Sequence, residues 1–140
     1  MPRPSCYYSI LPLTASCEAA MNVELILIAG PYRSGTNGDE RLIAQNLQRL
    51  EQAAWEVYQR GHVPVIGEWL ALPLAKAAGS QRLDDAISES LLYPVAHRLI
   101  GKCDAIYRIE GASQGADKDI EVAQQRGLKI YRSPEEIARL

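Results

Sequence analysis

The chain has 140 residues, of which 47% are hydrophobic and 23% are charged, and its formal net charge is −2. This composition is typical of one globular domain with a hydrophobic core, and the slightly acidic balance disfavours a nucleic-acid polymer as partner. No apolar run approaches the ~20 residues that a membrane-spanning helix needs. We therefore expect a cytoplasmic protein that has no membrane partner.

The cysteines and histidines are few and widely separated, at Cys6, Cys17, Cys103, His62 and His97. A zinc site usually needs four ligands, often in closely spaced pairs. The sequence therefore predicts no metal site, and it suggests no cofactor. An odd number of cysteines without a disulfide pattern fits a reducing compartment such as the cytoplasm.

The first twenty residues are interpreted separately from the rest. Their apolar stretch faintly resembles a secretion signal, but Pro4 and Pro12 interrupt it. Alternatively, translation starts at Met21, because strand-like sequence follows directly. We expect residues 1–20 to be a disordered extension and residues 21–140 to form the domain.

The domain begins with a predicted strand at residues 23–29, which are almost continuously apolar and β-prone. A turn-rich loop follows over residues 30–38. Apolar residues at helical spacing predict a helix from 39 to 60, ended by Gly61. Residues 62–66 then predict a short second strand.

The next segment contains two prolines that affect the predicted helices. Residues 70–78 could form a helical turn or an ordered loop, because Pro73 disfavours a long regular helix. The apolar spacing from Leu83 to Val95 predicts another helix, which Pro94 is expected to kink or split.

The last third predicts a strand at 105–109, a helix at 116–125 and a strand at 128–131. Ser133 then predicts the start of a final helix, because proline and two glutamates follow this capping residue. The alternation of strands and helices predicts an α/β fold, a three-layer α/β/α arrangement around a parallel sheet of four to five strands.

Two loops of this fold are candidates for one ligand site. The first is the Gly/Pro turn at residues 30–35, and the second is the small-residue loop at 111–116. Each follows a predicted strand. Open parallel sheets bind ligands at the edge formed by the carboxyl ends of their strands, so we expect both loops to lie at that edge.

The second loop suits an anion. Backbone N–H groups at a helix N-terminus favour phosphate or carboxylate, Ser113 adds a hydroxyl, and Gly115 permits close approach. Alternatively, Ser113 only caps the helix, which is the commoner role. In the first loop Arg33 could bind a phosphate and Tyr32 could stack on a base, or both could be exposed loop residues.

Acidic residues provide candidates for chemistry. Asp117 and Asp119 fall in the first turn of the predicted helix, where the helix dipole should keep them ionised and suited to act as nucleophiles. Ordinary charge preference at a helix start is the alternative. Glu68 ends the second strand beside Trp69, where the two could hold a ribose and a base, although Trp69 suits core packing at least as well. Asp104 precedes the third strand and should lie at the opposite end.

Four motifs together resemble one family. They are A-G-P-Y-R at 29–33, G-H-x-P at 61–64, C-D-A-I at 103–106 and S-x-G-A-D at 113–117. Over residues 22–132 the chain resembles the nucleoside 2-deoxyribosyltransferase superfamily, and within it a small bacterial branch called DUF4406. The resemblance implies a flavodoxin-like fold. It also implies a hydrolase or transferase that cleaves or exchanges the N-glycosidic bond of a 2′-deoxynucleoside or its 5′-monophosphate through a covalent glycosyl–carboxylate intermediate.

The resemblance also implies roles for single residues. Asp119 occupies the position of the family's glutamate nucleophile, six residues after Ser113. Tyr32, Glu68 and Asp104 match further positions of the catalytic site. The implied substrate- and phosphate-binding residues are Gly30, Arg33, Ser34, Ser113, Gly115, Ala116 and Asp117.

Aspartate at position 119 is a departure from the family pattern. Its side chain is one methylene shorter than glutamate, and small displacements of a nucleophile strongly affect rates. Either the pocket closes up around Asp119, or the chain binds a nucleotide as a non-catalytic sensor module. A scaffold that contacts a protein partner is a third possibility, which rests on fold analogy alone. The resemblance further implies a homodimer or a larger homo-oligomer.

Overall fold

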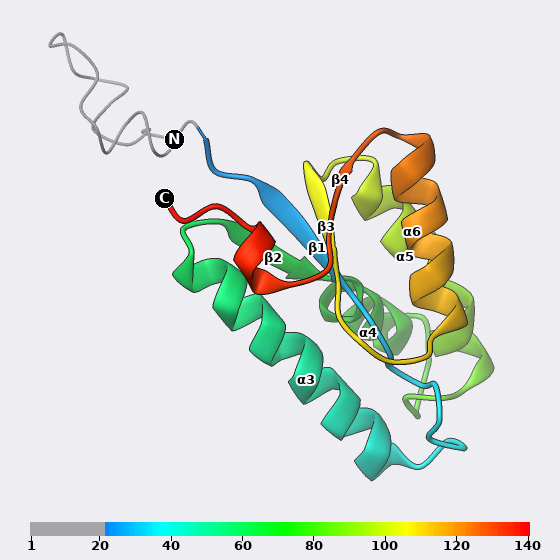
Figure 1. Cartoon of the computed structure of the whole chain (residues 1–140). Coiled ribbons are helices and arrows are strands. Elements are labelled where there is room, and N and C mark those ends of the chain that lie inside the picture. Colours follow the sequence, from blue (N-terminus) through cyan, green and yellow to red (C-terminus); the bar gives the residue numbers. More distant parts are fainter. Residues whose placement is uncertain (1–21) are drawn as a thin grey trace, which may run out of the picture.

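The structure is a computed structural model that describes residues 22–140; the predicted extension and the alternative start at Met21 lie outside these residues. Four parallel strands form one sheet in the order β2-β1-β3-β4 (Figure 1). This confirms the expected α/β fold, with four strands in the sheet. The strands are β1 (Leu25–Ala29), β2 (Val63–Ile66), β3 (Ala105–Arg108) and β4 (Lys129–Tyr131).

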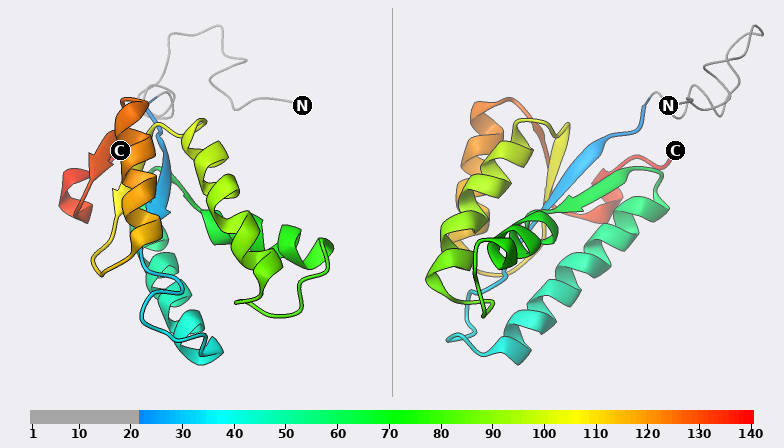
Figure 2. Two further views of the ribbon diagram at one scale, coloured as in Figure 1. Left: turned by 90° about the vertical axis from the view of Figure 1, so that its right-hand side faces the viewer. Right: turned by 180° about the vertical axis from the view of Figure 1, so that it is seen from behind.

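Helices cover both faces of the sheet, as Figure 2 shows in two further views. The long helix α3 (Glu40–Gln59) packs against β1, β2 and the 3₁₀ turn η1 (Pro134–Glu136). The other layer contains α4, α5 and α6, in which α5 contacts both neighbours. These helices span Gly67–Ala77, Ala86–Ile100 and Gln114–Gln125.

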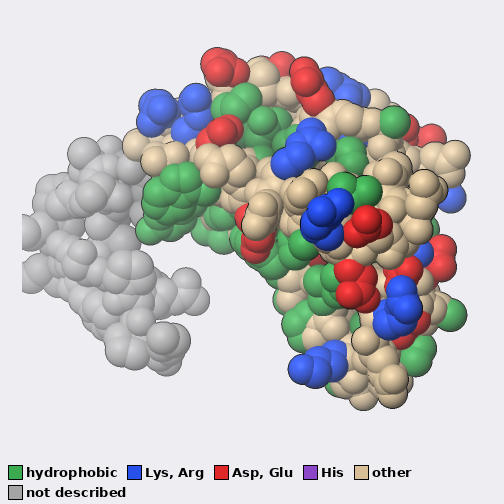
Figure 3. All heavy atoms as spheres, turned by 90° about the horizontal axis from the view of Figure 1, so that it is seen from below, with side chains coloured by type: hydrophobic (Ala, Val, Ile, Leu, Met, Phe, Trp, Pro, Cys, Tyr) green, Lys and Arg blue, Asp and Glu red, His purple; other side chains and the backbone are tan. Residues whose placement is uncertain are grey.

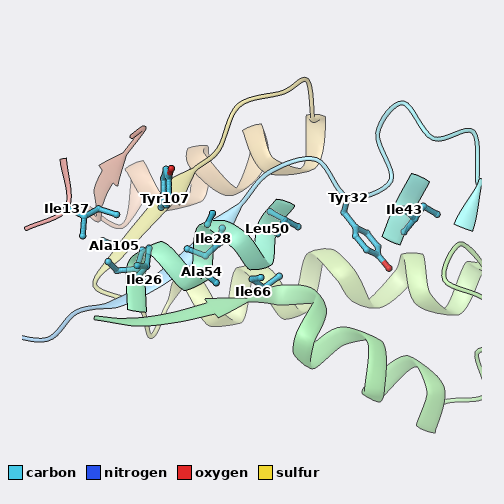
Figure 4. Close-up of a cluster of buried hydrophobic side chains, with 12 residues drawn as sticks. Ile26, Ile28, Tyr32, Ile43, Leu50, Ala54, Ile66, Ala105, Tyr107 and Ile137 are labelled. Atoms are coloured by element: carbon cyan, nitrogen blue, oxygen red, sulfur yellow. The ribbon is translucent and has the colours of Figure 1, made fainter. Parts of the chain in front are cut away.

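The apolar run of the first strand is buried on both faces of the sheet. Ile26 and Ile28 point into the cluster beneath α3, drawn in Figure 4, whereas Leu27 and Ala29 join the cluster beneath α6. Side chains alternate between the faces of a strand, so a strand that is covered on both sides needs apolar residues at every position. Tyr32 lies toward one end of the α3-side cluster, after the carboxyl end of β1.

The prolines do not interrupt the helices as the sequence suggested. Pro73 lies within the eleven-residue helix α4, and Pro94 lies within the fifteen-residue helix α5, which is not split. The expected break at Pro73 and the expected split at Pro94 were wrong, because both weighed the local helix propensity alone. Packing of α4 against α5, with Ala71, Ala75 and Ala96 buried, outweighs the backbone hydrogen bond that each proline omits.

Further element boundaries also differ from the sequence-based expectation. Helix α6 begins at Gln114, two residues earlier than expected. The predicted final helix is only the 3₁₀ turn η1, although the Glu136 carboxylate does accept a hydrogen bond from the Ser133 N–H at 3.2 Å. After this turn Ile137 is buried in the α3-side core, so the chain leaves the helical path. Within residues 22–140, no helix is both long and apolar enough to cross a membrane.

Candidate functional site

A cavity of about 310 Å³ opens beside the carboxyl ends of β1, β2 and β3. The strand order reverses between β1 and β3, and open α/β sheets bind ligands at such a switch point. The volume is in the range of small-molecule sites. The polar and small lining residues are Ala29, Gly30, Tyr32, Arg33, Ser34, Gly67, Glu68, Glu89, Tyr93, Ala96, Ser113, Gly115, Ala116 and Asp119.

The loops after β1 and β3 touch each other, as the sequence predicted. A Cβ atom on Gly30 would overlap the side chain of Ile109, so only glycine fits there. Pro31 packs closely on Gly111, whose φ of +119° favours glycine. These contacts bring the Tyr32–Arg33 loop next to the N-terminus of α6.

Most predicted site residues line this cavity, but two acids do not. The Asp104 carboxylate accepts a hydrogen bond from the Leu25 N–H at 2.8 Å, at the opposite end of the sheet. Asp117 points outward from α6, with a side chain 67% exposed, and pairs with Arg108 at 3.0 Å. Trp69 is neither in the core nor in the cavity: it is exposed at the surface, where its indole N–H donates to Glu51.

Two carboxyl groups, Glu68 and Asp119, enter the cavity from different helices. Glu68 is in the first turn of α4, directly after β2, and Asp119 is on α6. Burial raises the pKa of Glu68 to about 7. Burial, and then the charge of Glu68, raise the pKa of Asp119 to about 7, against a smaller opposing effect of Arg108. Near neutral pH, one carboxyl can therefore hold a proton while the other is charged.

The expectation that the helix dipole keeps Asp119 ionised was wrong. Because α6 begins at Gln114, Asp119 lies in the second turn of the helix. The dipole acts mainly within the first turn, whereas removal of a carboxylate from water disfavours its charged form strongly. Desolvation therefore decides the protonation of Asp119.

Ser113 is the N-cap of α6, and its hydroxyl oxygen accepts a hydrogen bond from the Ala116 N–H at 3.1 Å. The capping role is thus confirmed. Capping uses a lone pair of the oxygen, so the hydroxyl hydrogen can still be donated to a ligand. The same side chain lines the cavity and can serve both purposes.

Arg33 is fixed at the cavity by residues of and before α5. Its Nη1 lies 3.5 Å from the Glu89 carboxylate, and its Nη2 donates to the Asp84 carbonyl at 3.3 Å. Beside it, the buried Tyr32 hydroxyl has no hydrogen-bond partner among the described residues. Burial raises the pKa of Tyr32 to about 12, so this phenol can donate a hydrogen bond to a ligand.

The contribution of α5 to the cavity was not predicted from the sequence. Glu89 and Tyr93 line the cavity, and His97 continues their i, i+4 spacing toward Asp119. This spacing was a usable signal. Arg108 was missed as well: it is buried and donates to the carbonyls of Ile109 and Gly111, which holds the loop after β3.

Acidic and basic side chains both line the cavity, namely Glu68, Glu89 and Asp119 together with Arg33. The face of the molecule seen from below in Figure 1 carries acidic and basic side chains side by side (Figure 3). Among residues 22–140, no group of histidine, cysteine and acidic side chains is arranged to hold a metal ion. No model of a known protein family matches the chain, and a search of curated proteins finds no significant match.

Proposed function

We propose that this protein is an enzyme that cleaves or transfers the N-glycosidic bond of a (deoxy)nucleoside or its 5′-monophosphate. The observation that carries the proposal is the presence of Glu68 and Asp119 in one cavity, each with a pKa of about 7. Glycosidic cleavage through a covalent intermediate needs one ionised carboxylate and one protonated acid. A hydrolase and a transferase share this first step.

In this mechanism a carboxylate oxygen of Asp119 attacks C1′ of the sugar while the bond from C1′ to the base breaks. The bonding electrons go to the base nitrogen, which takes the proton of Glu68. Water or a second base then attacks C1′ and releases the Asp119 carboxylate, and the attacking group returns a proton to Glu68. Tyr32 supplies a hydrogen-bond donor that positions the sugar. Asp104 takes no part, because it lies at the other end of the sheet.

A 5′-phosphate would bind where the two loops meet. Side-chain hydrogen-bond donors at this end of the cavity are Arg33 and the Ser113 hydroxyl. The backbone that a phosphate could approach closely belongs to Gly30, Ser34, Gly115 and Ala116. The N-terminus of α6 adds the favourable field of its dipole. Asp117 lies outside this arrangement because it faces solvent.

The test is release of free base, measured by chromatography after incubation with a panel of deoxynucleosides and their 5′-monophosphates. We expect the wild type to release base, Asp119→Asn to abolish release, and Glu68→Gln to lower kcat. Glu121→Gln, an exposed acid on the same helix, is the matched control and should retain activity. Full activity of Asp119→Asn would show that Asp119 is not the nucleophile.

The second candidate is a nucleotide-binding module without turnover. It is favoured by the short side chain of Asp119 and by the partial protonation that its raised pKa implies near neutral pH. Thermal unfolding with the same compounds separates the candidates, since a ligand at 100 times its Kd adds ~2.7 kcal/mol of apparent stability. Stabilisation without any base release would support the binding module.

We further propose that the protein is a cytoplasmic homodimer or larger homo-oligomer. Within the described part of the chain, residues 22–140, the buried thiol of Cys103 forms no disulfide, as is usual in a reducing compartment. Leu70 and Leu74 on α4 are about half exposed and belong to an apolar surface that a second copy could cover. Light scattering coupled to gel filtration would measure the mass, and a monomer at micromolar concentration would contradict the proposal.

A further inference from the structure

His97 lies in the last turn of α5 and approaches Asp119 from behind the cavity. Its Nε2 atom is 3.5 Å from Oδ1 of Asp119. Both atoms are buried, and neither has a hydrogen-bond partner within residues 22–140. The α5 residues that line the cavity are Glu89, Leu92, Tyr93 and Ala96. His97 is therefore placed to act on Asp119 and not on a ligand.

The other histidine of the chain has a different environment. Nδ1 of His62 accepts a hydrogen bond from the Glu24 N–H at 3.0 Å, and Nε2 lies 2.7 Å from the Ala138 carbonyl. Both ring nitrogens are thus occupied by the backbone, and the ring is buried. His62 is a structural residue, whereas the inward nitrogen of His97 faces a carboxyl group.

Several charged and polar groups surround the His97–Asp119 pair. The charge of Glu68 on α4 raises the pKa of Asp119, and that of Arg108 on β3 lowers it. On α5 the centroid of the Tyr93 ring lies 6.2 Å from that of the His97 ring. The Lys118 ammonium of α6 lies over the Tyr93 ring, 5.3 Å from its centroid. Among these neighbours, His97 is the one with a nitrogen 3.5 Å from Oδ1 of Asp119, and an imidazole nitrogen can accept a proton.

Burial of a nucleophilic carboxyl group opposes the ionisation that its reaction needs. Its attack requires the ionised form, but desolvation and the nearby Glu68 favour the protonated form. Transfer of the proton to an adjacent imidazole resolves this conflict, because the pair then contains a carboxylate and an imidazolium and its net charge is unchanged. An opposite charge at this distance stabilises the ionised carboxylate.

We propose that His97 is a positioning residue for Asp119, which accepts the proton of its carboxyl group and holds the carboxylate toward the cavity. The transfer moves one proton from Oδ1 of Asp119 to Nε2 of His97. In the proposed reaction, on which the catalytic consequence rests, the carboxylate then forms the bond to C1′ and is released again in the second step. His97 keeps its proton throughout and returns it when Asp119 is next protonated.

The pairing is tested by NMR titration of the histidine rings, which needs no substrate. The chain has two histidines, so His62 serves as an internal reference in each spectrum. We expect Asp119→Asn to lower the midpoint of the His97 titration by about one pH unit, because an opposite charge is lost, and to leave His62 unchanged. A His97 midpoint that is the same in both proteins would overturn the proposal.

Base release as a function of pH tests the consequence for catalysis. His97→Gln keeps a donor near Asp119 but cannot accept its proton, and His97→Phe removes both properties. For both variants we expect the acidic limb of the kcat profile to move to higher pH, with a loss of tenfold or more at pH 6 and little change in KM. His97→Gln should retain more activity than His97→Phe.

A purely structural role would lower activity by the same factor at every pH, and this result would overturn the proposal. Failure of the proposed function is a separate outcome. If the wild type releases no base from any compound, the proposed reaction is wrong, and the NMR titration alone decides whether His97 and Asp119 are paired.

Discussion

Arg33 contributes a positive charge to a cavity that also contains the carboxyl groups of Glu68, Glu89 and Asp119. Its guanidinium is held by Glu89 at 3.5 Å and by the Asp84 carbonyl. A phosphate that binds Arg33 must therefore compete with Glu89, which is 64% exposed and can swing into solvent. If the proposed function holds, the charge at this position should discriminate between a 5′-monophosphate and a neutral nucleoside.

Arg33→Ala should weaken the binding of a 5′-monophosphate much more than that of the free nucleoside. Loss of a charge-assisted hydrogen bond from a partly buried site costs on the order of 1.5–3 kcal/mol, roughly ten- to a hundredfold in affinity. Glu89→Gln, which removes the competing charge, should tighten monophosphate binding. Calorimetric titration measures both, and equal losses for nucleoside and monophosphate in Arg33→Ala would mean that the arginine is structural.

At the scale of elements, α6 connects the stability of the fold to the site. Its N-cap Ser113 bonds the Ala116 N–H and lines the cavity, and its second turn carries Asp119. The start of the helix thus sets the positions of the groups that could donate hydrogen bonds to a phosphate and the position of the candidate nucleophile. A change of the cap should affect folding and binding together.

Ser113→Ala should destabilise the protein by ~1 kcal/mol, the usual cost of removing an N-cap, and should also weaken monophosphate binding. Asp39→Ala is the matched control, because Asp39 caps α3 through the N–H groups of Arg41 and Leu42, outside the cavity. It should show a similar loss in denaturant unfolding and unchanged binding. A Ser113→Ala protein as stable as the wild type would contradict the capping role.

At the scale of the whole molecule, the cavity carboxyls make folding stability depend on pH. The pKa of Asp119 rises from 3.8 to about 7 on folding. Between these values the unfolded chain has lost the proton and the folded protein still binds it. The contribution of Asp119 to stability is therefore present at low pH and is lost as the pH rises toward about 7. Glu68 acts in the same direction, because its pKa is also raised.

Asp119→Asn should accordingly be more stable than the wild type at pH 8, by about 1–3 kcal/mol, and nearly equal to it at pH 4. The amide cannot ionise, so the cost of a buried charge disappears. Denaturant unfolding at the two pH values measures the effect, with the exposed Glu121→Gln as control. A variant that loses stability equally at both pH values would show that the carboxylate is not penalised by burial.

Local patterns predicted the strands, most of the helices and the edge at which the candidate residues meet. The apolar run at β1 indicates a strand covered on both faces. In a parallel sheet the carboxyl ends of strands share one edge, so the sequence alone places Arg33, Glu68 and Ser113 at the same edge. The structure places Asp119, the candidate nucleophile that the family resemblance implies, at the same cavity.

What only the tertiary structure decided depends on contacts between distant segments. Helix α4 persists through Pro73 because α5 packs on it. The protonation of Asp119 depends on burial and on Glu68, which is 51 positions away in the sequence, and its neighbour His97 belongs to another helix. Desolvation is the combined effect of all the groups packed around a side chain. Neither spacing nor residue type reports that effect, so the sequence named the nucleophile candidate and the fold set its charge.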